Sequence, residues 1–196
     1  MTGRYPTRFW HELNAVTRVS GLSLQVTTLP ARLKSLGYAT CDIGKWHLGQ
    51  SAEYRPTKRG LDEFFGTLNN TPFFHPTNFI DTRKSNEIVD INDPSFYTTD
   101  RYAERALDWL SSRKDEPWFL YLPFNAQHAP LQATQKYLDG FPNLTDKRKI
   151  FAAVMSAMDD AIGSVMSKEQ AESTAKDADR ARPNRPKKNN PKKQTT

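Results

Sequence analysis

The stretch that decides the fold is TLPARLKSLGYATCDIGKWHLG, residues 28–49. Thr28 is placed to cap a helix whose apolar residues recur at helical spacing, and Gly37 stands where a left-handed residue ends such a helix. Residues 39–43 then read as a short strand and residues 44–49 as a turn. A helix, a glycine and a strand in this order are typical of an α/β protein.

The rest of the chain alternates between helical patterns and short apolar runs. Residues 50–94 resemble a loop, since prolines interrupt them repeatedly. A helix is predicted from near Thr99, a strand covered on both faces at residues 118–122, and a last helix over residues 145–166. We therefore expect an α/β fold with a largely parallel or mixed sheet and helices on both faces.

The net charge of +6 is unevenly distributed. Residues 168–196 hold nine Lys or Arg against four Asp or Glu, a balance of +5, which leaves +1 for residues 1–167. This division predicts one globular domain over residues 1–167 and a basic, disordered tail over residues 168–196. The tail leaves open a non-enzymatic protein that binds a polyanion.

The body of the chain favours neither nucleic acid nor membrane as a partner. It lacks a surface on which basic and aromatic residues interleave, so no nucleic-acid partner is expected. No run of about 18 apolar residues occurs, so no membrane span is expected. The start of the chain does not resemble a secretory signal, and the single cysteine, Cys41, excludes an internal disulfide. The cellular location is left undecided.

Lys45 and His47 lie at the end of the first predicted strand, where ligands bind in open α/β sheets. Because they are two residues apart, an extended backbone would point both side chains to one side, and the flanking glycines would let a ligand approach closely. A fixed cation beside an imidazole suits a small oxyanion. The alternative is a surface lysine and a structural histidine in a turn.

A further histidine is a candidate for the same site. His128, in the segment QHAP (residues 127–130), follows the strand at residues 118–122 and could meet the first site across the sheet edge. The alternative is a loop histidine bonded to backbone.

Four segments in order carry a resemblance to a known family. They are LGY with GKWHLG (residues 36–38 and 44–49), GLDEFFG (60–66), FLYLPF with HAPL (119–124 and 128–131), and AMDDAIG (157–163). Together they resemble the type I, arylsulfatase-like sulfatases of the alkaline-phosphatase-like superfamily. The resemblance implies that residues 1–167 are an internal piece of a sulfatase catalytic domain, truncated at both ends.

The resemblance also implies an activity and roles for the candidate residues. Members of this family hydrolyse aryl or carbohydrate sulfate esters with a formylglycine nucleophile and calcium. Lys45 would hold the nucleophile and a sulfate oxygen, and His47 would bond the formylglycine and act as a base in sulfate release. His128 would bind sulfate at the ester oxygen and help to protonate the leaving group. The expected partner is a sulfated small molecule or carbohydrate. His75 lies in the region where the family varies with substrate and would face the leaving group; the alternative is a loop histidine in an aromatic cluster.

The sequence departs from the family pattern in ways that bear on activity. Residues 2–4, TGR, resemble the end of the nucleophile signature, whose reactive residue would lie upstream of Met1. Cys41 lacks the Pro and Arg of that signature and is interpreted as a small buried strand residue.

Calcium is expected for the full family domain, but its ligands are absent from this chain. Asp159 and Asp160 point about 100° apart on a helix and are interpreted as surface acids. This chain alone is therefore expected to be inactive. A phosphate-ester hydrolase of the same superfamily remains the alternative enzyme.

Overall fold

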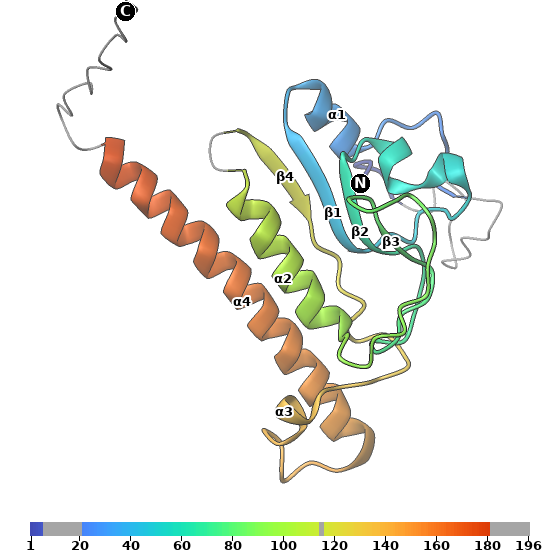
Figure 1. Cartoon of the computed structure of the whole chain (residues 1–196), viewed down its shortest axis with the longest axis vertical. Coiled ribbons are helices and arrows are strands. Elements are labelled where there is room, and N and C mark those ends of the chain that lie inside the picture. The colour runs from blue at the N-terminus through green and yellow to red at the C-terminus, as the bar shows by residue number, and fades with distance from the viewer. Residues whose placement is uncertain (6–20, 114–115, 181–196) are drawn as a thin grey trace, which may run out of the picture.

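The computed structural model describes residues 1–5, 21–113 and 116–180. A sheet of four strands forms its centre, in the order β3-β2-β1-β4 (Figure 1). The strands are β1 (Ala39–Lys45), β2 (Glu63–Thr67), β3 (Phe79–Asp81) and β4 (Trp118–Tyr121). Strands β2 and β4 run parallel to β1, whereas β3 pairs antiparallel with β2. The expected α/β fold with a mixed sheet is confirmed.

The segment that leads into β1 folds as its sequence predicts. Helix α1 covers Leu29–Ser35, and the Thr28 hydroxyl accepts a hydrogen bond from the Ala31 amide at 3.3 Å. Gly37 follows the helix with a φ of 86°, a left-handed conformation that glycine adopts without strain. Strand β1 is buried along its middle five residues, as befits a central parallel strand.

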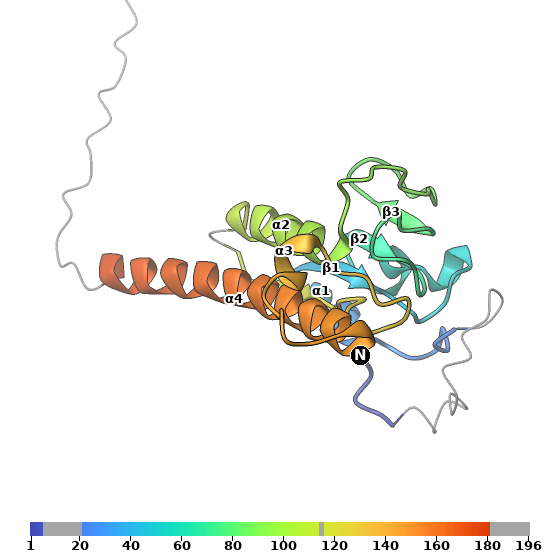
Figure 2. The same ribbon diagram turned by 90° about the horizontal axis from the view of Figure 1, so that it is seen from below.

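Apolar clusters cover both faces of the sheet. On one face, β1 residues Cys41 and Ile43 pack against helix α2 (Thr98–Ser111). The other face carries a cluster of Trp46, Leu61, Phe64, Leu68 and Ile80. Helix α4 (Asp146–Arg180) lies beside α2 (Figures 1 and 2), and the short helix α3 (Gln135–Leu138) packs against α4.

Residues 50–94, expected to be a loop, contain strands β2 and β3 and two 3-10 turns, η2 (Ala52–Tyr54) and η3 (Pro56–Arg59). The signal for β2 was the alternation of its aromatic pair. Phe64 belongs to one apolar cluster and Phe65 packs against the cluster on the opposite face. The surrounding prolines obscured this short period-two pattern.

The interpretation of residues 118–122 as a strand covered on both faces was wrong in its burial. Strand β4 is half-buried throughout, because β1 is its only strand neighbour in the described sheet. Within the described sheet, this unbroken apolar run therefore belongs to a half-buried strand at the edge.

Helix α4 continues beyond residue 166, where the sequence predicted its end. Residues 168–180, assigned from sequence to a disordered tail, are helical in the structure, and residues 181–196 lie outside the described residues. The physical reason is composition, since residues 167–180 contain neither glycine nor proline and are rich in helix-forming residues.

Among the described residues, one helical stretch, Asp146–Ala171, is long and apolar enough to cross a membrane by length and composition. The core helix of a soluble protein passes the same test, so this is weak evidence. The expectation of no membrane span stays a prediction.

Candidate functional site

The backbone that carries Lys45 and His47 is fixed from both sides. The Lys45 amide donates to the Pro123 carbonyl beyond β4 at 2.8 Å, and the His47 amide donates to the Leu68 carbonyl beyond β2 at 3.1 Å. Between them, Trp46 is only 2% exposed and its indole N–H donates to the Tyr54 carbonyl at 2.9 Å. Both polar side chains therefore flank a buried anchor at the carboxyl end of the central strand.

The backbone is left-handed at His47 and at the residue before His128. His47 has a φ of 54° and Gln127, next to His128, has a φ of 72°. The expectation that an extended backbone aligns Lys45 with His47 therefore does not apply, because the strand ends at Lys45. Left-handed backbone at residues other than glycine costs about 1–3 kcal/mol and is frequent at functional sites.

Gly44 is needed for close backbone packing and not for close approach of a ligand. Its φ is 144°, and a Cβ there would overlap the Pro123 carbonyl oxygen and lie 2.7 Å from the carbonyl carbon. A Cβ on Gly66 of β2 would in turn overlap the Gly44 carbonyl. The space beside Gly44 is thus filled by β2 and by the chain that follows β4, which corrects the expectation from sequence.

The electrostatics of the site connect its three candidate residues. Burial lowers the pKa of His47, and the charges of Lys45 and His128 lower that pKa further. Burial also lowers the pKa of Lys45. His47 therefore favours the neutral imidazole, which has a lone pair and can accept a proton.

His128 sits in a turn supported by a buried asparagine. The His128 amide donates to the Asn125 carbonyl at 3.1 Å, and the Asn125 side chain is held by the Tyr102 hydroxyl at 2.9 Å. The side-chain amide Nδ2 of Asn125 also donates to the Thr67 hydroxyl of β2 at 3.4 Å. Sequence analysis missed Asn125, whose only local signal is its place as the first polar residue after the apolar run at residues 118–124.

The ring of His128 has partners on both nitrogens. Nδ1 lies 2.8 Å from the Ala129 carbonyl oxygen, and Nε2 lies 3.0 Å from Nδ2 of Asn70. The alternative interpretation, a loop histidine bonded to backbone, is therefore met at Nδ1. The side chain of Asn70 also holds the ring, at Nε2. Sequence analysis gave no signal for Asn70.

Two of the buried residues of β1, Cys41 and Asp42, take no direct part in the proposed site. Cys41 is fully buried, and burial raises the pKa of its thiol, so it is the small buried strand residue that was expected. Its neighbour Asp42 is also fully buried, which raises the pKa of the carboxyl well above its usual range. Neither carboxyl oxygen of Asp42 has a hydrogen-bond partner in the described structure.

The described residues include no group of three or more His, Cys, Asp or Glu side chains that could hold a metal ion. Asp159 and Asp160 are exposed on α4, where Asp160 lies 3.8 Å from the Lys136 ammonium, which confirms them as surface acids. His75 is an exposed loop residue with a φ of 51°.

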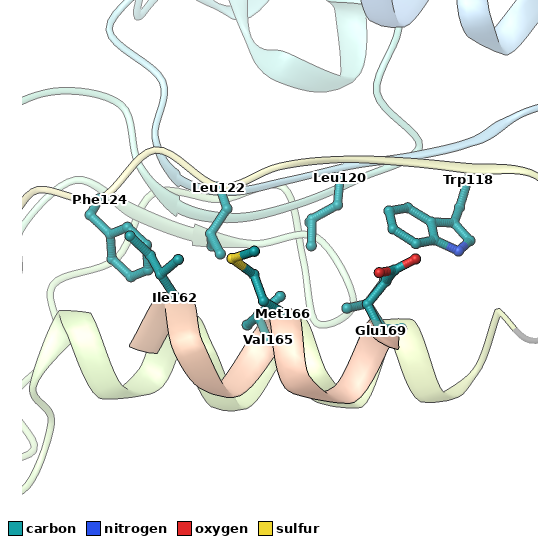
Figure 3. A pocket seen from close by; sticks show the side chains of 9 residues that line it. Trp118, Leu120, Leu122, Phe124, Ile162, Val165, Met166 and Glu169 are labelled. Atoms are coloured by element: carbon teal, nitrogen blue, oxygen red, sulfur yellow. The ribbon is translucent and has the colours of Figure 1, made fainter. Parts of the chain in front are cut away.

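A groove of about 420 Å³ lies between β4 and α4 (Figure 3). Its lining is apolar apart from Glu169 and includes Trp118, Leu120 and Met166. It contains none of Lys45, His47 and His128. The candidate anion site is therefore separate from this groove.

Comparison with known proteins gives consistent matches over most of the chain. The family model described as Sulfatase matches residues 1–178. The chain is 34% identical to arylsulfatase J of Mus musculus over 179 residues, covering 84% of this chain and 30% of that protein. It is 29% identical to N-acetylgalactosamine-6-sulfatase of Homo sapiens, covering 85% of this chain and 35% of that protein.

Solved structures show the same fold. The crystal structure of Ps i-CgsB in complex with k-i-k-neocarrahexaose matches with a TM-score of 0.73 and 28% identity, covering 88% of this chain and 43% of that one. A protein solved in complex with D-glucosamine-2-N,6-O-disulfate matches in fold, with a TM-score of 0.56 and 24% identity over 73% of this chain and 26% of that one. Arylsulfatase J and N-acetylgalactosamine-6-sulfatase are longer proteins, and the chain spans about a third of the length of each.

Proposed function

Because the chain belongs to the sulfatase family, we propose that Lys45, His47 and His128 bind the sulfate group in a site for sulfate-ester hydrolysis. The observation that carries the proposal is the position of the three residues, because Lys45 and His47 follow the central strand β1 and His128 follows its parallel neighbour β4. The pKa of His47, which is lowered by burial and by the charges of both other residues, supports it. Three polar groups from two strands would approach a small anion from more than one direction.

Each side chain has a role that its environment supports. The Lys45 ammonium would neutralise charge on the sulfate oxygens, and its anchored strand end holds it in place before the substrate arrives. His47, which favours the neutral form, would accept a proton as a general base. His128 would contact the ester oxygen and supply a proton to the departing alcohol.

We further propose that the family's nucleophile, a formylglycine, supplies the hydroxyl that attacks sulfur. No described residue is assigned this part, since Cys41 is fully buried. Calcium remains a proposal for the whole domain, since the described residues do not offer a ligand cluster. On this basis the chain alone does not turn over sulfate esters.

For the substrate we propose an aryl sulfate or a sulfated carbohydrate. The names of arylsulfatase J and N-acetylgalactosamine-6-sulfatase support these two classes, and so does the disulfated glucosamine bound by a protein of the same fold. A phosphate ester is the competing substrate, because phosphate presents a similar set of equatorial oxygens.

The proposal is tested by titrating the full chain with 4-nitrophenyl sulfate, 4-nitrophenyl phosphate and 4-nitrophenol while recording backbone amide spectra. We expect the sulfate ester to shift the amides of Lys45, His47 and His128. Lys45→Met should weaken binding about 10–100-fold, as for loss of a charge-assisted hydrogen bond of about 1.5–3 kcal/mol.

Lys84→Met, at an exposed loop lysine, is the matched control and should leave binding unchanged. Equal shifts with 4-nitrophenol would show that only the ring binds, and tighter binding of the phosphate ester would favour the competing enzyme class. Release of 4-nitrophenol from the sulfate ester by the chain alone would contradict the proposed lack of turnover.

A further inference from the structure

The side chain of Asn70 reaches across the end of the sheet to His128. Asn70 lies beyond the end of β2 and His128 beyond the end of β4, while β1, which ends in Lys45, lies between these two strands. Asn70 Nδ2 is 3.0 Å from His128 Nε2. The backbone of Asn70 is itself held, because its amide donates to the Asn69 side-chain oxygen at 2.8 Å. This contact spans the strand end that carries the rest of the proposed site.

The partners of the His128 ring determine where its proton lies. A backbone carbonyl can only accept a hydrogen bond, so Nδ1, at 2.8 Å from the Ala129 oxygen, must carry a hydrogen. In the neutral ring Nε2 then has a lone pair, which accepts from the N–H of Asn70. The Ala129 carbonyl therefore selects the tautomer, and the Asn70 N–H completes it at Nε2.

We propose that Asn70 is a positioning residue that holds the orientation of the His128 ring and donates to its bare Nε2. The contact stands on geometry alone, whereas its importance for turnover rests on the proposed function, in which His128 acts on the ester oxygen. In the tautomer that the Ala129 carbonyl selects, Nε2 has no hydrogen to give. To protonate a leaving group, the ring must first take up a proton at Nε2.

An asparagine side chain can serve both forms of the ring. Its N–H group donates to a bare Nε2, and after rotation of the amide its oxygen accepts from a protonated Nε2. Asp at this position could only accept, and Ala could do neither. The side chain at position 70 therefore limits which proton arrangements of His128 are hydrogen-bonded at Nε2 in the empty site.

The test reads the ring nitrogens directly in the ¹⁵N-labelled full chain by long-range ¹H–¹⁵N spectra. It is done at about pH 8.5, which is about two units above the usual pKa of histidine. The His128 signals are identified by their loss in His128→Gln. In the unmodified chain we expect a protonated Nδ1 and an unprotonated Nε2.

Two substitutions and one control complete the test. Asn70→Asp should move the Nε2 signal to the frequency of a protonated nitrogen, since the carboxylate only accepts. Asn70→Ala removes the donor to Nε2, so the Nε2 signal should move while Nδ1, still bonded to the Ala129 carbonyl, stays protonated. Asn143→Asp places the same charge change on an exposed residue of another loop and should leave the His128 ring as it was. Unchanged amide and His47 signals show that a variant is folded.

A protonated Nε2 in the unmodified chain would overturn the inference, and so would an Asn70→Asp variant whose His128 ring is unaltered. If Asn70→Asp does not fold, Asn70→Ala decides, because a ring identical to that of the unmodified chain would refute a role for Asn70. The proposed function is tested separately. If 4-nitrophenyl sulfate shifts no signal in any variant, the proposed function fails while the result on the His128 ring stands.

Discussion

Gly44→Ala should destabilise the protein strongly and displace Lys45. An alanine Cβ would overlap the Pro123 carbonyl oxygen. It would also lie 2.7 Å from the carbonyl carbon, whereas ordinary van der Waals contacts of a Cβ begin at 3.4 Å. The obstructing atoms are backbone, so no side chain can rotate away. The chain beyond β4 must retreat from β1, which breaks the hydrogen bond from the Lys45 amide to Pro123.

Three effects contribute to the loss of stability. A φ of 144° is strained for alanine, at about 1–3 kcal/mol. Overpacking adds about 1–3 kcal/mol, and the lost hydrogen bond about 0.5–1.5 kcal/mol. Since these effects overlap, we expect a decrease of roughly 3–6 kcal/mol in the free energy of unfolding. In a chain of this size that corresponds to a fall in Tm of about 6–24 °C.

The assay is urea unfolding of the full chain, followed by tryptophan fluorescence, for Gly44→Ala and Gly163→Ala. Gly163 is the matched control, because it lies within α4 and a Cβ there meets nothing within 4 Å. The control should gain about 0.5–1 kcal/mol from the higher helix propensity of alanine. A Gly44→Ala variant within about 0.5 kcal/mol of the unmodified chain would refute the packing of β1 described above.

Two further predictions concern buried charge. Asp42→Val should raise the free energy of unfolding by about 1–3 kcal/mol, because it removes a buried carboxyl without a partner. Since burial raises the folded-state pKa of Asp42, this carboxyl costs more stability as pH rises above about 3.9, so the gap should widen from acid to neutral pH. A thermal scan that shows Asp42→Val to be less stable would mean that the carboxyl has a partner in solution. Lys45→Met should raise the pKa of His47, because a positive charge nearby is lost, while burial still holds that pKa below its usual value. Imidazole signals followed through a pH titration measure this change, and Lys84→Met should leave the His47 titration as it was; an equal shift in both variants would contradict the assigned cause.

Local signals in the sequence predicted the parts of the fold that depend on neighbouring residues. The Thr28 cap and the left-handed Gly37 are of this kind, and both occur as expected. The two short strands β2 and β3 were missed, since their pairing partners lie elsewhere in the chain. The edge position of β4 was missed for the same reason, because an apolar run does not reveal how many strands flank it.

The candidate site divides in the same way. Lys45, His47 and His128 stand out by motif and by position after strands, and their roles stay predictions. Asn70 and Asn125 do not stand out, because each gains its importance from a contact with a residue 58 or 23 positions away, His128 and Tyr102 respectively. Such contacts are a property of the folded sheet end and have no signature in the linear sequence.

The most direct test of the shared site is a crystal structure of the full chain grown with selenate, whose selenium is located by anomalous scattering. We predict one selenate with oxygens about 2.7–3.2 Å from Lys45 Nζ and from ring nitrogens of His47 and His128. A structure in which the His128 side chain lies more than about 12 Å from Lys45 would contradict the shared site. Two hydrogen bonds of about 2.7–3.2 Å to one anion cannot bridge that distance.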